Sequence, residues 1–264
     1  MRALDPAVAA RRSAEWAASS KATSSTRSRT IWSRSPTRSL IAGYFNVGGK
    51  RAYTRSVAAL PDPLPDDPLP LVEAWLKEAA AVARNATAMT LATVTPEGRA
   101  AARMVICRGF DVRAGWLVFY TDRESDKGHD LAKHPQAALV FHWEGLERQV
   151  RVDGPVTLAP DADSDRYWAT RPRDARVAAV ASLQSRPLAG RAELLARVAE
   201  AGRQHAGEVP RPPRWGGYRV WAERVELWAG QPARVHDRAR WTRTLTPAGE
   251  AWTGGPWRAT RLMP

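Results

Sequence analysis

The sequence predicts a mainly β protein with peripheral helices, an α+β class in which the strands form a barrel-like sheet. Short segments with the β-branched, aromatic and alternating content typical of strands recur along the chain. Helical segments stand between them without the regular strand–helix alternation of a doubly wound parallel sheet. With 264 residues and 44% hydrophobic content, the chain can bury a sizeable core.

The N-terminal part is expected to lie outside that core. Residues 1–47 carry nine serines between Ser13 and Ser39 and show no sustained periodicity, so we expect a disordered basic tail. An Arg/Ser-rich, acid-poor start is also compatible with an organellar transit peptide. Residues 48–67 are expected to form a lid or linker, because the prolines from Pro61 onward cannot donate backbone hydrogen bonds.

The folded domain is predicted over residues 68–264 and begins with a helix. Asp67 can cap this helix, Pro68 suits its first position, and it should end near Arg84. Its apolar residues recur at helical spacing: Leu69, Val72, Trp75, Leu76, Ala79 and Ala83.

A β-hairpin is predicted next, from two strands over 88–94 and 101–107 joined by the turn sequence Thr95–Gly98. Gly154-Pro155 indicates a bend within a long strand, and Ser125 can cap a short helix that ends before Pro135. Further helices are predicted over 161–170 and 189–206. Further strands are predicted over 116–121, 137–143, 148–158, 218–228, 240–245 and 257–262.

Charge and cysteine content narrow the function classes. The net charge is +13, but residues 1–60 alone hold 11 Lys and Arg against two acidic residues, so the basic excess belongs mostly to the tail and a nucleic-acid function is disfavoured. Charged residues interrupt every apolar run well before the roughly 18 to 20 residues of a membrane span. The single cysteine, Cys107, cannot form an internal disulfide and fits a reducing, cytoplasmic setting.

Common catalytic signatures are absent from the sequence. It contains no phosphate-binding glycine motif of the usual kinds, no nucleophile elbow and no H-E-x-x-H. Its five histidines do not stand at metal-ligand spacing with a carboxylate or with Cys107, so no metal is expected. Basic and amide side chains at predicted strand ends remain as candidates. Each of these, taken alone, is more often a solvated surface residue.

As an ordered set, these candidates resemble the pyridoxamine/pyridoxine 5'-phosphate oxidases from about Lys50 to the C-terminus. The motifs are Arg103-Met-Val-Ile-Cys-Arg108, Phe119-Tyr-Thr121, Leu146-Glu-Arg-Gln149, Arg171-Pro-Arg-Asp174, Gln184-Ser185, Trp215-Gly-Gly-Tyr218, Val225-Glu-Leu-Trp228, Arg234-Val-His-Asp-Arg238 and Arg261-Leu-Met-Pro264. The resemblance implies a split β-barrel that binds FMN and works as a homodimer with two flavins at the interface. It also implies oxidation of pyridoxamine or pyridoxine 5'-phosphate by O2, which yields pyridoxal 5'-phosphate and H2O2 in vitamin B6 metabolism.

The family pattern assigns the flavin residues. Arg103 and Lys127 fall on positions that hold the FMN phosphate, where a dianion needs charge-assisted donors. Amide side chains suit the flavin ring, whose edge needs both donors and acceptors. The whole cofactor set is Arg103, Met104, Val105, Ile106, Cys107, Arg108, Tyr120, Thr121, Lys127, Gln149, Gln184, Ser185, Trp228 and Arg238. For Trp228, a structural role in the core or an interface is an equal alternative.

The substrate residues follow from the same resemblance. Arg234 and His236 fall on catalytic positions beside the pyridine ring and its reacting carbon, and we expect them on one face of an extended segment because they are two residues apart. The other substrate positions are the lid residues Lys50, Arg51 and Tyr53, together with Arg108, Tyr167 and Arg171.

Three positions depart from the family pattern, and all lie near expected phosphates. Arg108 replaces a usual lysine, Asp126 replaces a frequently basic residue, and Ala175 replaces a frequent serine. Two alternatives therefore stay open. One is a related flavin oxidase acting on another reduced ring, as in the phenazine pathway. The other is a flavin-binding split-barrel protein without catalysis.

Overall fold

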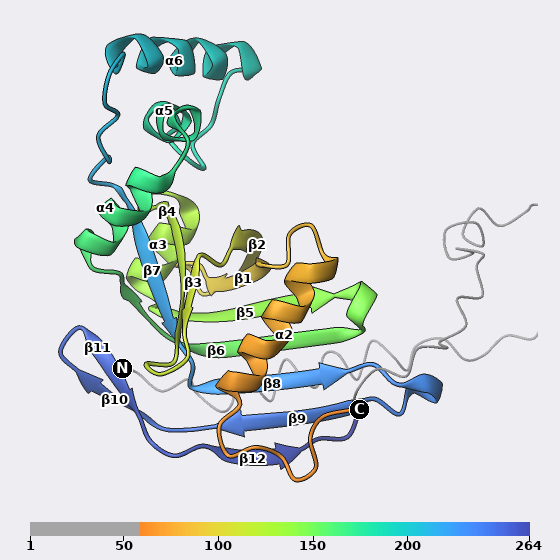
Figure 1. Ribbon diagram of the computed structural model, residues 1–264. Coiled ribbons are helices and arrows are strands. Elements are labelled where there is room, and N and C mark those ends of the chain that lie inside the picture. Colours follow the sequence, from red (N-terminus) through yellow and green to blue (C-terminus); the bar gives the residue numbers. More distant parts are fainter. Residues whose placement is uncertain (1–58) are drawn as a thin grey trace, which may run out of the picture. The chain divides into compact units, whose positions relative to one another are not determined.

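The computed structural model describes residues 59–264, coloured in Figure 1. The predicted tail over 1–47 and the lid residues Lys50, Arg51 and Tyr53 lie outside the described residues. Within the described part, no helix combines the length and the apolar content that a membrane crossing requires.

Ten antiparallel strands form one sheet with a branch in it. Its main path runs β12-β9-β8-β6-β5-β1-β2, and β6 also pairs with β7, which continues through β4 to β3. The strands are β1 (Ala88–Val94), β2 (Ala100–Ile106), β3 (Gly109–Asp111), β4 (Trp116–Asp122), β5 (Gln136–Trp143), β6 (Arg148–Leu158), β7 (Trp215–Trp221), β8 (Arg224–Ala229), β9 (Asp237–Thr242) and β12 (Arg258–Arg261). The predicted mainly β class is therefore confirmed, and so are the β1–β2 hairpin and the bounds of β1 and β6.

The bend predicted at Gly154-Pro155 is the branch point of the sheet. Residues Arg148–Asp153 of β6 pair with β8, whereas Val156–Leu158 pair with β7. A Cβ atom on Gly154 would lie 1.8 Å from the Trp221 carbonyl oxygen, so only glycine allows the backbones to approach this closely. One long strand can therefore serve both parts of the sheet.

The first helix, α2 (Leu69–Val82), packs its apolar face on the sheet. Leu69, Val72, Trp75 and Ala79 are buried in the main core together with residues of β1, β5, β6 and β8. The Asp67 carboxylate accepts a hydrogen bond from the Leu69 N–H at 2.9 Å, which confirms its predicted capping role. The helix ends at Val82, two residues before the predicted end.

The short helix α3 (Asp126–Lys133) forms as predicted, and Ser125 stands at its N-cap position. The Ser125 hydroxyl makes no capping bond to a backbone N–H of α3; it donates to the Asp122 carbonyl oxygen at 2.6 Å instead. Ser125 also accepts a hydrogen bond from the Lys127 ammonium group, in the first turn of α3, at 3.0 Å. The hydroxyl therefore joins the end of β4 to the Lys127 side chain.

Three further helices gather at one end of β7: α4 (Asp161–Thr170), α5 (Arg173–Ala181) and α6 (Arg191–Gln204) (Figure 1). They share a second core made of Trp168, Val177, Ala201, Val209 and Trp215. The prediction gave α4 correctly and α6 nearly so, but it missed α5. The missed helix is short and buries only Val177 fully, but Val177, Val180 and Ala181 stand at helical spacing, so its signal was present in the sequence.

The C-terminal strands show the largest differences from prediction. The single strand predicted over 218–228 is wrong, because the chain turns at Ala222-Glu223 between β7 and β8. The chain between β9 and β12 forms a separate two-stranded hairpin, β10 (Leu245–Ala248) and β11 (Ala251–Gly254). Apolar and aromatic residues on both sides of the turn made 218–228 resemble one strand, although Glu223 and Arg224 interrupt them.

Candidate functional site

Three expected cofactor residues meet where β4, α3 and the segment after α5 come together. The Gln184 side-chain oxygen accepts hydrogen bonds from the Lys127 ammonium group at 2.7 Å and from the Thr121 hydroxyl at 2.9 Å. Thr121 and Lys127 are buried, and Gln184 is exposed. Residues 63 positions apart in the chain are thus joined directly.

Arg103 lies beside this cluster, on β2. Its guanidinium donates to the Thr93 hydroxyl at 2.5 Å and to the Asp130 carboxylate at 3.2 Å. Burial, together with the neighbouring Arg103 cation, lowers the pKa of Lys127 below the ordinary lysine value of 10.5. Two cations held this close form a donor set that suits a phosphate dianion.

The expected substrate-phosphate residues form an aromatic and cationic cluster next to the first group. Tyr120 stacks on Tyr167 with ring centroids 4.3 Å apart, and both rings stack on Trp215. The guanidinium of Arg171 lies 4.9 Å from the centre of the Trp215 ring, and that of Arg108 lies 5.7 Å from the centre of the Tyr167 ring. Cation–π contacts of this kind hold guanidinium groups in place.

A cavity of about 390 Å³ opens between these two clusters. Burial is the main reason that the pKa of Arg171 is lowered, and the nearby Arg108 cation adds to the shift. Arg171 also donates to the Ala175 carbonyl oxygen at 3.0 Å. The cavity is lined by Tyr120, Thr121, Asp122, Arg171, Ala175, Ala178, Ala179, Ser182, Gln184 and Trp215.

A second group of expected residues lies on the outer face of β6, β8 and β9. Gln149 pairs across the strands with Trp228, and Trp228 pairs with Arg238, so their side chains share a face. Arg238 donates to the Glu226 carboxylate at 2.8 Å, and Arg240 donates to the other oxygen of that carboxylate at 2.9 Å. Burial opposes ionisation of Glu226, but these hydrogen bonds outweigh it and lower its pKa.

The expected catalytic pair does not lie on an extended segment, so that prediction was wrong. Arg234 ends a short 3-10 turn (η2, Pro232–Arg234) with φ of 62°, and Ala233 before it has φ of 56°. Two consecutive non-glycine residues in the left-handed region carry strain of about 1 to 3 kcal/mol each. Residues two apart share a face only in extended strand backbone, so that expectation does not apply to this turn.

His236 lies close to the second group despite this turn. Its ring centroid is 4.8 Å from that of Trp228. Its Nδ1 accepts a hydrogen bond from the Gln231 N–H at 3.1 Å, so the neutral ring carries its proton on Nε2. Arg234 is exposed on the same connection between β8 and β9.

The remaining expected cofactor residues range from exposed to buried. Met104 on β2 is 64% exposed, Val105 and Ile106 are half-buried, and Ser185 is exposed with φ of 72°. The Cys107 thiol faces the main core, and burial raises its pKa to about 11, so it stays protonated at neutral pH.

The two groups are not connected within the part of the chain that the structure describes. No hydrogen bond, ion pair or ring contact there links Arg103, Thr121, Lys127 and Gln184 with Gln149, Trp228, His236 and Arg238. In Figure 1, α4 and α5 lie at one end of β7, whereas the β8–β9 connection lies at the far end of β8.

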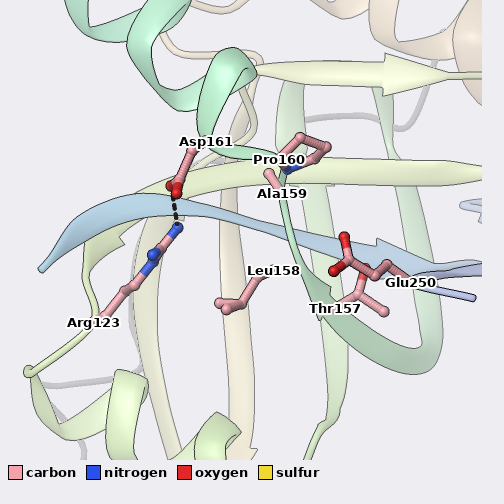
Figure 2. A pocket seen from close by; sticks show the side chains of 7 residues that line it. All are labelled: Arg123, Thr157, Leu158, Ala159, Pro160, Asp161 and Glu250. Carbon is pink, nitrogen blue, oxygen red and sulfur yellow. Dashed lines mark hydrogen bonds and ion pairs between the residues drawn. The ribbon is translucent and has the colours of Figure 1, made fainter. Parts of the chain in front are cut away.

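Figure 2 shows a different cavity, of about 400 Å³, between the end of β6, the start of α4 and the β10–β11 hairpin. Arg123 and Asp161 form an ion pair of 3.4 Å at one side, and Glu250 lies at the other beside Thr157 (Figure 2). None of the expected site residues lines this cavity, so cavity size alone does not locate the site.

Sequence reasoning did not name several residues that hold the site together. Asp130, which stands in none of the motifs, receives hydrogen bonds from both Arg103 and Thr93. The spacing Lys127-x-x-Asp130 was a usable signal, because residues three apart share a helix face.

Trp215 and Glu226 stand within the motifs but were not named as site residues. Trp215 lies beside Arg171, and Glu226 accepts hydrogen bonds from Arg238. The sequence does not show these contacts, because it does not show which strands are neighbours.

The branched antiparallel sheet, with its helices gathered at the end of β7, defines a split β-barrel of the FMN-binding type. PhzG from Burkholderia lata, solved in complex with tetrahydrophenazine-1-carboxylic acid, has this fold with a TM-score of 0.70 and 30% identity, covering 80% of this chain and all of that one. An FMN-binding protein from Nostoc punctiforme shares the fold with a TM-score of 0.57 and 18% identity over 74% of this chain and 96% of that one.

Sequence relatives identify the family. The pyridoxamine 5'-phosphate oxidase family matches residues 76–206, and the pyridoxine 5'-phosphate oxidase C-terminal dimerisation region matches residues 215–264. A pyridoxine/pyridoxamine 5'-phosphate oxidase of Rhodospirillum rubrum is 50% identical over 71% of this chain and 94% of its own length. One of Azorhizobium caulinodans is 51% identical over 75% and 91%. The chain belongs to the pyridoxamine 5'-phosphate oxidase family, a family of oxidoreductases.

Proposed function

We propose that this protein is an FMN-dependent oxidase that converts pyridoxamine or pyridoxine 5'-phosphate to pyridoxal 5'-phosphate, with O2 reduced to H2O2 and, for the amine, water taken up and ammonia released. The observation that carries the proposal is the convergence of Lys127, Thr121 and Gln184 beside Arg103, at the edge of a cavity that Arg171 also lines. Two cationic centres near one cavity suit a phosphorylated cofactor and a phosphorylated substrate.

The residues present fit FMN. Arg103 and Lys127 would hold its phosphate, because a dianion favours the charged form of Lys127 against the burial and the Arg103 repulsion that lower its pKa. The Thr121 hydroxyl and the Gln184 amide add neutral donors next to them. When bound, FMN would supply the redox chemistry: it would accept a hydride, two electrons with one proton, from the substrate carbon, and the two electrons together with two protons would reduce O2 to H2O2.

The chain's own residues would bind and orient the substrate. Arg171 and Tyr167, with Arg108 over the tyrosine ring, offer donors for its phosphate. Arg234 and His236 would hold the pyridine ring, with His236 fixed by its bond from the Gln231 N–H. Holding the reacting carbon near its acceptor supplies much of the rate enhancement in such reactions.

The complete site would combine two subunits. The match of residues 215–264 to a dimerisation region supports a homodimer, and the lack of contact between the two groups in the described chain fits a site shared across its interface. We therefore expect one subunit to supply Lys127 and its partners, and the other to supply His236, Trp228 and Arg238.

Mixing two inactive variants tests this arrangement. In a heterodimer of Lys127→Met with His236→Ala, one shared site is intact and the other carries both defects. Activity should therefore return on co-refolding, up to about one quarter of wild type for a statistical mixture in which half the dimers are mixed. If each site came from a single chain, the mixture would be no more active than its two components.

Purified protein provides the direct test of the activity. It should be yellow with a flavin spectrum, and it should release one H2O2 for each pyridoxal 5'-phosphate formed from pyridoxine 5'-phosphate. A colourless preparation that ignores added FMN would overturn the proposal.

A second candidate is oxidation of a reduced phenazine precursor, which the likeness to the Burkholderia lata protein favours. Side-by-side turnover separates the two, because the Arg171 and Tyr167 cluster should favour a phosphorylated substrate over a carboxylated tricyclic one. Bound FMN without turnover of either substrate would indicate a non-catalytic flavin-binding protein.

A further inference from the structure

Arg214 connects the two elements that bring the flavin-site cluster together. It stands just before β7, and its side chain is 18% exposed. Its Nε donates to the Asp122 carboxylate at 2.8 Å, at the end of β4. Its Nη2 donates to the carbonyl oxygens at the end of α5, those of Ala179, Val180 and Ser182, at 3.0 to 3.1 Å.

The partners of Arg214 adjoin the cluster on both sides. Asp122 follows Thr121 directly, and Ser182 precedes Gln184 by two residues. The last carbonyl groups of a helix lack partners within the helix and carry partial negative charge, so a cation is favourable there. One guanidinium therefore fixes the end of β4 to the end of α5, at the place where Gln184 must reach Thr121 and Lys127.

Few other contacts hold the segment after α5 in this position. Gln184 is exposed, and Ser185, which follows it, is exposed with a left-handed φ of 72°. The nearest further tether is a hydrogen bond from Arg186 to the Glu124 carbonyl oxygen, at 3.5 Å, the outer limit for such a bond. Without Arg214, the buried Asp122 carboxylate would lose its cation and the α5 carbonyl groups would lose their donor.

Taking the proposed FMN site as given, we infer that Arg214 is a positioning residue for it. Arg214 acts through Gln184: it holds the 182–186 segment so that the Gln184 amide stays against Thr121 and Lys127. It does not touch the flavin. Arg214 lies outside all of the family motifs named in the sequence analysis.

A double-mutant cycle on FMN affinity tests the inference. Arg214→Met should weaken FMN binding about tenfold, and Gln184→Ala should weaken it by a similar factor. If Arg214 acts through Gln184, the double variant should bind no more than about twofold more weakly than Gln184→Ala alone. Independent factors that multiply to about a hundredfold would overturn the inference, as would an unchanged affinity in Arg214→Met.

A second measurement does not depend on flavin. Hydrogen–deuterium exchange of the backbone amides of residues 183–186 should be faster in apo Arg214→Met than in the apo wild type, because the segment is no longer tethered. Arg214→Lys serves if Arg214→Met does not fold, since lysine can pair with Asp122 but lacks the planar fork. It should show an intermediate affinity and exchange rate, and wild-type values for both would overturn the inference.

Arg173→Met is the matched control, because Arg173 donates to the carbonyl oxygens of Gly202 and His205 at the end of α6. It should leave FMN affinity and the amide exchange rate of residues 183–186 within about twofold of wild type. Wild-type protein that binds no FMN would overturn the proposed function. Wild-type protein that binds FMN, with multiplicative losses in the cycle, would overturn only the role of Arg214.

Discussion

Replacing His236 by alanine is expected to lower kcat/KM for pyridoxine 5'-phosphate at least about a hundredfold, while FMN still binds. The His236 ring is fixed by the Gln231 N–H and lies 4.8 Å from Trp228, so its Nε2 proton has a defined place. Alanine removes this donor and leaves room in which the substrate ring can shift. Steady-state kinetics and flavin fluorescence quenching measure the two effects separately.

His205→Ala is the control for this experiment. His205 caps α6, and only its backbone carbonyl oxygen is used by Arg173, so the alanine variant keeps that bond. It should match the wild type in kcat/KM. The assignment of His236 fails if its alanine variant keeps wild-type kcat/KM, or if the variant loses FMN as well as activity.

Replacing Lys127 by methionine is expected to weaken FMN binding at least about a hundredfold, the largest effect on affinity that we predict. The ammonium group is buried and donates to Gln184, Thr121 and Ser125. Loss of a charge-assisted hydrogen bond to a phosphate costs about 1.5 to 3 kcal/mol, and loss of the buried cation adds to this. Lys133→Met, at the exposed end of the same helix, should bind FMN like the wild type.

The pH dependence of FMN affinity should also depend on Lys127. Its pKa in the free protein lies below 10.5, because burial and Arg103 disfavour the charged form. A bound phosphate dianion favours that form and raises the pKa, so binding takes up a proton in the interval between the two values. Above about pH 7, where the FMN phosphate, with a second pKa of about 6, is a dianion, FMN affinity should therefore be constant up to the lowered pKa of Lys127 and fall as the pH rises through this interval.

Titration of FMN at several pH values checks this expectation. The fall should disappear in Lys127→Met and persist in Lys133→Met. An unchanged fall in Lys127→Met would assign it to another group and would contradict the role of Lys127.

Most of the fold followed from local sequence patterns. The bounds of β1 and β6 and the cap at Asp67 were predictable because alternation, helical spacing and capping chemistry are local properties. The turn between β7 and β8 was not, because it contains no glycine or proline and β-prone residues flank it on both sides. The helix α5 was missed although Val177, Val180 and Ala181 stand at helical spacing, so this helix could have been predicted.

The candidate site, like the fold, was predictable from the sequence only in part. The ordered motifs along the chain were enough to point to Lys127, Gln184 and His236. The folded chain was needed to show that Gln184 meets Lys127, that Arg234 lies in a turn, and that Arg214 ties α5 to β4. These contacts join residues up to 92 positions apart. Such pairs depend on which strands and helices become neighbours, and this is set by the packing of the whole sheet and not by any local pattern.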